Sequence, residues 1–220
     1  MKFVLALFVV LLAVVMHKYK LFCMSSFAPV SKAEQKHMYK VLYRVTDAMN
    51  KANIQYFLFY GTLLGAMRHN SVIPYDDDVD IAIFEDDVQK FLGLELDLEG
   101  YKTHKMERWD DFYKIYDDAD GFNIPKPWIP WKWPFVDVFV LRPDDKGGYH
   151  DTYNHFTKEQ LLPAKEVLFG DRMMFVPNQA SRVLDTLYGR SWRTIWKSST
   201  WHHRLESWML FPKVRVMTTS

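Results

Sequence analysis

Apolar and polar residues recur along the chain with two different periods, and the period of each stretch predicts its secondary structure. Between Ser31 and Ala52 the apolar residues recur at the spacing of one helix face, and Ser31 followed by Glu34 forms a capping box. The runs at 56–60 and 79–84 are short and rich in aromatic or β-branched residues, which predicts buried strands. The same reasoning predicts a helical segment at 61–69, a helix at 86–92, strands at 101–106, 111–116 and 135–141, a short helix at 157–162, a hairpin at 166–176 with its turn at Gly170-Asp171, and a helix at 178–187.

This succession of elements predicts one domain of the α/β or α+β class, with a small mixed sheet flanked by helices. The length of 220 residues fits a single domain, which we expect at residues 31–200, followed by a tail at 201–220 without a readable role. His202-His203 in the tail is a possible metal-binding pair. Because adjacent residues point to opposite sides of a strand, we predict that this pair does not bind metal.

The N-terminus carries an apolar run of 14 residues, from Phe3 to Met16, directly after Lys2. As a helix this run would reach about 21 Å, which is short of the roughly 30 Å hydrocarbon core of a membrane. Residues 1–24 therefore fit a signal peptide, or a short signal-anchor with Lys18 and Lys20 reaching the membrane surface; a core helix is the third alternative. The first two alternatives predict a protein of the secretory pathway, in the ER or Golgi membrane with a lumenal domain, or secreted if the segment is cleaved.

Composition narrows the choice of partners. The net charge of +1 gives no support for a nucleic-acid partner. Cys23 is the single cysteine, so an internal disulfide is impossible.

Four aspartates gather where the loop before residues 79–84 enters the predicted strand. Asp78 and Asp80 are two residues apart, so in a strand their side chains share one face, opposite Val79, Ile81 and Ile83. Two carboxylates this close repel, so one must be protonated or a cation must lie between them. Carboxylate ligands favour a hard ion such as Mg²⁺ or Mn²⁺. A solvated acidic turn is the alternative.

Gly61-Thr62 follows the first predicted strand and opens a helical segment. A glycine lets backbone N–H groups approach a phosphate closely, and a threonine hydroxyl at a helix start can add a donor. Alone, the pair is an ordinary helix start. Its position just before the aspartates favours a phosphate site.

Two further charged residues lie inside apolar runs. Asp137 is the only charge in the predicted strand 135–141, where it needs a partner or a metal. It is thus a candidate third acidic ligand; a loop contact is the alternative. Lys114 lies among aromatic residues of another strand, either as a charge that protects a sheet edge or as a phosphate ligand.

The loop at 121–134 combines four prolines with three tryptophans, and the prolines predict that it has no regular structure. The tryptophans either cover the core or form a platform for a sugar or a nucleobase, with Lys126 and Lys132 near a phosphate.

Gly-Thr-Leu-Leu-Gly-Ala-Met-Arg-His at 61–69, followed by Ile-Pro-Tyr-Asp-Asp-Asp-Val-Asp at 73–80, resembles the signature of the LicD family, which includes bacterial phosphorylcholine transferases, fukutin and the fukutin-related protein. The resemblance is dense over 55–84 and weaker at 136–139 and 187–192. Tyr75 stands where that family usually has tryptophan, which keeps an aromatic ring.

This resemblance implies a nucleotidyltransferase-like fold and the transfer of a substituted phosphate, such as phosphocholine or ribitol phosphate, from a CDP-activated alcohol to a glycan or glycoprotein hydroxyl. Its implied site has Mg²⁺ or Mn²⁺ on Asp78, Asp80 and Asp137, and Asp76 as a base or as support for the metal. Phosphate contacts are expected from Gly61, Thr62, Arg68, His69 and Lys114.

Two alternatives remain from the residues. One is an enzyme that attaches a whole nucleotide to a sugar or macromolecule, since the same metal site serves attack at another phosphorus. The other is a non-catalytic binding protein of the secretory pathway. Release of CMP would favour phosphate transfer, release of pyrophosphate would favour nucleotide transfer, and the absence of metal binding would favour a binding protein.

Overall fold

The computed structural model describes residues 10–11, 14–15, 30–94, 98–106, 112–197, 201–208 and 214–216. Most of the predicted signal segment at 1–24 therefore lies outside the described residues. The four residues of it that are described are helical and solvent-exposed. Among the helices of the described part of the chain, none has both the length and the apolar character needed to span a bilayer.

The first long element is α2, Lys32–Lys51, and it begins as the sequence predicts. The Glu34 N–H donates to Ser31 Oγ over 3.3 Å, and the Ser31 N–H donates to Glu34 Oε2 over 2.8 Å, so both halves of the capping box form. The apolar positions that recur at helical spacing are buried: Met38, Val41, Leu42, Val45 and Met49. The helix is therefore held both by its cap and by its packing on the sheet.

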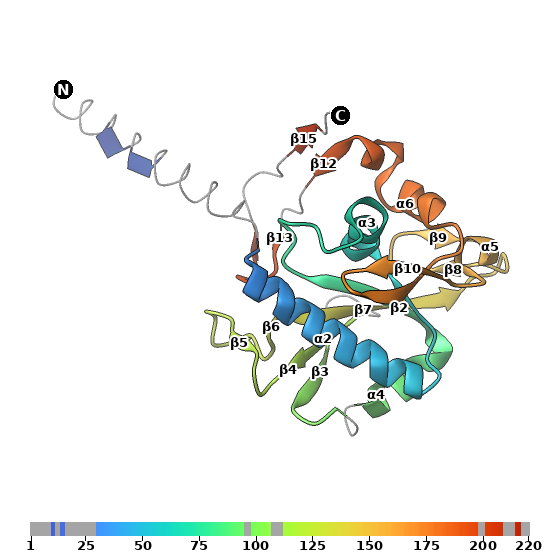
Figure 1. The fold of residues 1–220 in the computed structure, drawn as a ribbon, viewed down its shortest axis with the longest axis horizontal. Coiled ribbons are helices and arrows are strands. Elements are labelled where there is room, and N and C mark those ends of the chain that lie inside the picture. The colour runs from blue at the N-terminus through green and yellow to red at the C-terminus, as the bar shows by residue number, and fades with distance from the viewer. Residues whose placement is uncertain are drawn as a thin grey trace.

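The core of the fold is a mixed sheet with the strand order β1-β2-β7-β4-β3 (Figure 1). The strands are β1 Tyr56–Leu58, β2 Val79–Phe84, β7 Phe135–Pro143, β4 Phe112–Asp117 and β3 Tyr101–Lys105. Only the β2–β7 pair of this described path is parallel. Two short strands, β8 Tyr149–His150 and β9 His155–Phe156, extend the sheet from β7. The prediction of a small mixed sheet flanked by helices is confirmed.

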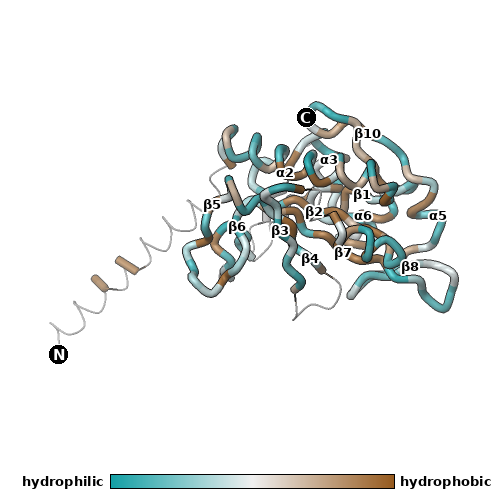
Figure 2. The backbone as a smooth tube through the Cα atoms, turned by 90° about the horizontal axis from the view of Figure 1, so that it is seen from below, coloured by the Kyte–Doolittle hydropathy of each residue, from teal (hydrophilic) through white to brown (hydrophobic). Residues whose placement is uncertain are grey.

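Strand register gives the sheet one apolar face and one face with acidic residues. On the first face Ile81 is opposite Val138, and this face packs against α2, whose Lys40 reaches Asp117 at the end of β4. On the second face Asp80 is opposite Asp137. Figure 2 shows that the residues of the central strands β2 and β7 are mostly hydrophobic, and that hydrophilic residues are found in outer parts such as β8.

The other elements lie around this sheet. They are α3 Tyr60–His69, η1 Glu85–Asp87, α4 Val88–Gly93, β5 Phe122–Asn123, β6 Lys132–Trp133, α5 Lys158–Leu161, β10 Lys165–Phe169, β11 Arg172–Val176, α6 Ala180–Tyr188, η3 Arg190–Arg193, β12 Ile195–Lys197, β13 Trp201–His202, β14 Ser207–Trp208 and β15 Val214–Val216.

Two predictions about these elements need correction. Tyr60, expected to end a strand, is the first residue of α3 and has a φ of 37°. The loop 121–134 is not wholly irregular, because β5 pairs with β6 through residues of the loop that are not prolines. In the tail, for which no elements were predicted, β13 pairs with β14, and β15 pairs with β12.

Candidate active site

Three aspartates from two adjacent parallel strands meet on the acidic face of the sheet. Asp80 and Asp137 are register partners, and Asp78 precedes β2 on the same side. Each side chain is buried, with exposed fractions of 6%, 6% and 1% for Asp78, Asp80 and Asp137. Within the described residues, ligand atoms of Asp78, Asp137 and His203 lie within 4.8 Å of one another.

Burial and mutual repulsion both disfavour ionisation of these carboxyls. Burial first, and then the charges of Asp137 and Asp77, raise the pKa of Asp78 well above its usual range. Burial and the neighbouring Asp78 and Asp137 do the same to the pKa of Asp80. A cation that binds between these groups would remove the penalty, which is the physical signature of a metal site.

Lys114 partly compensates this negative charge. Its Nζ lies 2.8 and 3.1 Å from the two Asp137 carboxylate oxygens and 3.7 Å from Glu206 Oε1. Burial raises the pKa of Asp137, while the Lys114 ammonium opposes this rise. The edge-strand explanation of Lys114 is wrong, because β4 lies between β7 and β3. Its role as a phosphate ligand stays a prediction, since the amine is held by Asp137 in this structure.

Gly61 and Thr62 fix the position of Asp80. The Gly61 N–H donates to Asp80 Oδ2 over 3.0 Å, and Thr62 Oγ1 accepts the Asp80 N–H over 2.7 Å. In this structure the Gly61 amide thus faces a carboxylate at the start of α3, where an anion is favoured. A Cβ on Gly61 would lie 2.6 Å from Asp76 Oδ2, so any side chain here would displace Asp76.

The second glycine of the motif has a structural role that the sequence did not indicate. A Cβ on Gly65 would lie 2.5 Å from the carbonyl oxygen of Ser71. Gly65 therefore lets α3 pack directly on the backbone of the loop that leads to the aspartates.

Arg68 and His69 lie at the far end of α3 from Gly61. Seven residues of helix separate Gly61 from Arg68 by about 10 Å along the axis. The Arg68 guanidinium donates to the Ile195 carbonyl over 3.1 Å and lies 5.8 Å from the centre of the Trp192 ring. Arg68 thus contacts the segment after α6, and contacts of either residue with a phosphate stay predictions.

Asp76 and Asp77 differ in their surroundings although they are adjacent. Burial and the charges of Asp78 and Asp77 raise the pKa of Asp76 well above its usual range. Burial would also raise the pKa of Asp77, but His202, His203 and the Arg204 amide outweigh burial and lower it. Asp76 is thus suited to hold a proton, whereas Asp77 is suited to stay charged and anchor the tail.

The tail, for which no role could be read from the sequence, contributes two histidines beside the aspartates. His203 Nε2 lies 3.0 Å from Asp78 Oδ2, and His202 Nδ1 lies 2.8 Å from Asp77 Oδ2. The two histidines do not lie at one site: His203, in the turn after β13, is beside Asp78, whereas His202 contacts Asp77, and metal binding by His203 stays a prediction. The only sequence signal was the histidine pair itself; no local pattern links it to Asp78.

Glu206 secures the same turn over the acidic face. It is 6% exposed; its Oε1 accepts from Trp131 Nε1 over 3.0 Å and its Oε2 from Trp201 Nε1 over 3.2 Å. Lys126 Nζ donates to the Glu206 carbonyl oxygen. Sequence reasoning missed Glu206 because, apart from Trp201, its side-chain partners Trp131 and Lys114 lie far away along the chain, in the tryptophan loop and in β4.

Two of the three tryptophans in the tryptophan loop cover the core, and the third is exposed. Trp131 and Trp133 are 7% and 1% exposed and cover the core, whereas Trp128 is 72% exposed. Lys132 Nζ donates to the Asp118 carbonyl oxygen, and Lys126 bonds to the tail. Both lysines therefore have structural partners, and only Trp128 is left as a free aromatic face among the three tryptophans.

The donor set fits a divalent cation. Asp78 and Asp137 offer oxygen ligands and His203 offers a ring nitrogen, all in reach of one point. Asp80 lies beside these groups with one oxygen bound to Gly61, so its role as a ligand stays a prediction.

The fold and the site define a nucleotidyltransferase-type domain, and the family comparison agrees. The family model described as "LicD/FKTN/FKRP, nucleotidyltransferase domain" matches residues 53–179. The chain belongs to this family, which confirms the resemblance seen in the motif.

The relatives that match this chain are matched over only part of their own length. The chain is 28% identical to ribitol 5-phosphate transferase FKRP of Mus musculus over 66% of this chain and 30% of the relative. It is 33% identical to the lipopolysaccharide cholinephosphotransferase LicD of Haemophilus influenzae over 40% of this chain and 35% of the relative. The matched region is thus about a third of each of these two proteins. Among solved structures, lincomycin-bound lincosamide antibiotic adenylyltransferase LnuA matches 71% of this chain and 85% of that chain, at 15% identity and a TM-score of 0.44.

Proposed function

We propose that this protein is a metal-dependent transferase that moves a substituted phosphate, such as ribitol phosphate or phosphocholine, from a CDP-activated alcohol to a glycan hydroxyl. The observation that carries the proposal is the burial of Asp78, Asp80 and Asp137 together on one face of the sheet. Membership of the LicD family supports the reaction class, and the two named relatives suggest the two phosphate substituents.

The proposed reaction exchanges one phosphorus–oxygen bond for another. The acceptor hydroxyl oxygen attacks the phosphorus that carries the alcohol, the bond to the second phosphate breaks, and CMP leaves with the bond electrons. Asp76 in its ionised form would accept the hydroxyl proton, and its pKa, raised by burial and by its acidic neighbours, would make it a stronger base than an ordinary carboxylate.

Asp78, Asp137 and His203 would hold Mn²⁺ or Mg²⁺, with Asp80 beside them. When bound, the cation would neutralise the diphosphate and the charge that develops on the leaving nucleotide. Lys114 would keep the Asp137 carboxylate oriented toward it. Gly61 and Thr62 would hold Asp80 in place, and the missing side chain of Gly61 would leave room for the Asp76 carboxylate at the start of α3.

Product analysis tests this proposal. The full chain is incubated with Mn²⁺ or Mg²⁺, CDP-ribitol or CDP-choline, and a panel of sugar acceptors. We expect CMP release that depends on the metal and falls by about 100-fold or more in Asp137→Asn, because several kcal/mol of charge stabilisation is lost.

The surface variant Asp86→Asn is the matched control and should keep full activity, since Asp86 is exposed. Pyrophosphate release from nucleoside triphosphates, with no CMP from either CDP-alcohol, would show nucleotide transfer instead. No metal-dependent product and no metal binding would support a binding protein.

A further inference from the structure

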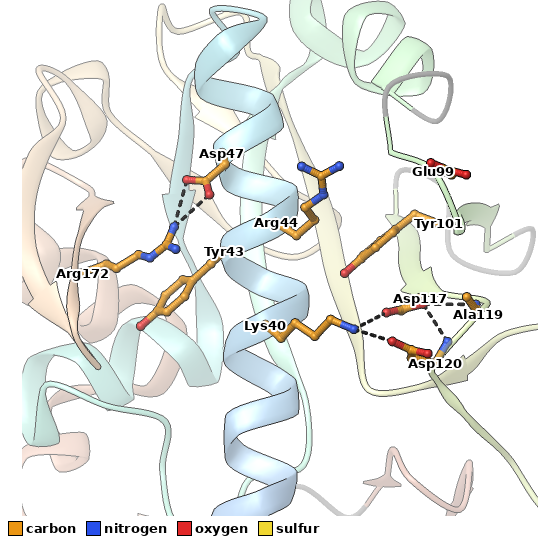
Figure 3. Close-up of a pocket in the computed structure, with 10 residues that line it drawn as sticks. All are labelled: Lys40, Tyr43, Arg44, Asp47, Glu99, Tyr101, Asp117, Ala119, Asp120 and Arg172. Carbon is orange, nitrogen blue, oxygen red and sulfur yellow. Dashed lines mark hydrogen bonds and ion pairs between the residues drawn. The ribbon is translucent and has the colours of Figure 1, made fainter.

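A hollow lies on the face of the sheet opposite to the aspartates. It has a volume of about 430 Å³ and lies between α2, the β3–β4 edge and the β10–β11 hairpin (Figure 3). Tyr101 and Asp117 are register partners, and Asp117 is on the α2 side of β4, whereas Lys114 is on the acidic side. This volume is in the range of small-ligand sites.

Most charges around this hollow already neutralise one another. Lys40 Nζ lies 3.1 Å from Asp117 Oδ2 and 2.7 Å from Asp120 Oδ2. Arg172 Nη1 contacts both Asp47 carboxylate oxygens, at 3.0 and 2.9 Å. The lining therefore offers no concentrated charge of one sign to an ionic ligand.

Three polar groups at the hollow have no partner among the residues that the structure describes. Tyr101 is 8% exposed, and its buried Oη has no hydrogen-bond partner in that part of the chain. Figure 3 shows this hydroxyl pointing toward α2, near the Arg44 and Lys40 side chains. Arg44 and Glu99 form no ion pair with any residue in the described part of the chain.

A buried hydroxyl without a partner is costly, and such groups are usually satisfied by a ligand or by water. Arg44 only donates hydrogen bonds, Glu99 only accepts them, and Tyr101 can do both. A ligand that contacts all three must present both donors and acceptors, and the buried Tyr101 hydroxyl is the group that most needs such a partner. The Tyr101 ring also lines the hollow, whereas the Tyr43 ring is covered by Arg172 and Tyr39.

We propose that this hollow is a binding site for a neutral saccharide unit. Sugar hydroxyls both donate and accept hydrogen bonds, and the C–H face of a sugar ring packs on an aromatic ring. An anion would meet Arg44 but also the neighbouring carboxylates, and an apolar ligand would leave Tyr101 Oη unsatisfied. The inference is independent of the proposed transferase activity, because binding here needs neither nucleotide nor metal.

Saturation-transfer NMR on the full chain tests the site with methyl glycosides of galactose, glucose, mannose and N-acetylgalactosamine, and with inorganic phosphate as the anionic probe. We expect at least one glycoside to bind. Tyr101→Phe and Arg44→Gln should each weaken that binding by about fivefold, the worth of one hydrogen bond. Tyr101→Phe removes only a hydroxyl without a partner, so it should melt like the wild type.

Tyr153→Phe and Arg182→Gln are the matched controls, because both side chains are exposed and away from the hollow. Asp137→Asn should also keep glycoside binding, which separates this site from the acidic one. The proposal is overturned if no glycoside binds, if Tyr101→Phe and Arg44→Gln bind as well as their controls, or if phosphate alone binds in an Arg44-dependent way.

Discussion

Residues of the acidic site hold one another in place by hydrogen bonds. Thr62, expected to donate to a phosphate, uses its hydroxyl oxygen to accept the Asp80 amide, and Gly61 donates to the Asp80 carboxylate. Tyr60 tolerates a positive φ next to these contacts, a strained conformation that fits a residue packed at a functional site. The Tyr60 hydroxyl donates to Asp151 Oδ2 over 2.8 Å, which helps to hold that backbone.

Metal-free stability should depend on pH through Asp80. Its folded pKa is raised by burial and by Asp78 and Asp137, so below the unfolded value of 3.8 the carboxyl is protonated in both states and costs nothing. As pH rises above that value the unfolded chain ionises first, and the stability associated with Asp80 is lost until the folded pKa is passed. In EDTA we therefore expect Asp80→Asn to exceed the wild type in stability at pH 7.5, by on the order of 1 kcal/mol, and by less at pH 4.5.

Urea unfolding of both proteins at the two pH values measures this difference. The comparison between variants is needed because other carboxyls act oppositely: against burial, the Asp120 amide and Lys40 lower the pKa of Asp117. Asn can still accept the Gly61 N–H, so the packing is kept. A variant less stable than wild type at both pH values would contradict the expectation.

Elements that are distant in sequence assemble the acidic site. The β2 and β7 strands bring Asp80 beside Asp137, β4 adds Lys114, and the turn after β13 adds His203. The tryptophan loop then holds that turn through the Trp131–Glu206 hydrogen bond. The tail turn therefore lies against the carboxylates of the candidate metal site.

His203→Ala should weaken Mn²⁺ binding by about tenfold or more, because it removes one of three clustered donors. Titration calorimetry on the full chain measures the affinity. His202→Ala is the matched control, since the neighbouring histidine contacts Asp77 instead of Asp78 and should leave the affinity within about threefold. Equal affinities of His203→Ala and the wild type would remove His203 from the site.

At the scale of the whole molecule, one sheet separates two surfaces of different character. The acidic face carries buried carboxylates, and the opposite face carries α2 and the hollow beside Tyr101. In the described part of the chain, the folded domain begins at Val30, whose N–H donates to the Pro74 carbonyl over 2.8 Å. Val10, Leu11, Val14 and Val15 are 48–64% exposed, so these four residues add nothing to the core.

We propose that residues 1–24 direct the chain to the secretory pathway and are dispensable for folding. Deletion of 1–24 should keep cooperative melting within a few degrees of the full chain, because α2 is capped from Ser31 onward. The same deletion should abolish protection of the chain from added protease in isolated microsomes. Loss of cooperative melting would show that the segment packs in the core, and unchanged protection would remove its targeting role.

The sequence by itself determined the elements whose signals are local. The capping box at Ser31, the apolar periodicity of α2 and the alternation in β2 predicted those elements because helix and strand periods are properties of consecutive residues. The motif and the isolated charge of Asp137 also identified the acidic site, since burying one carboxylate in an apolar strand requires a partner. Only the tertiary structure decided which partner each charge has. Lys114 and Asp137 are 23 residues apart and His203 lies far beyond Asp78, so strand order and chain return, which no local period encodes, set these contacts.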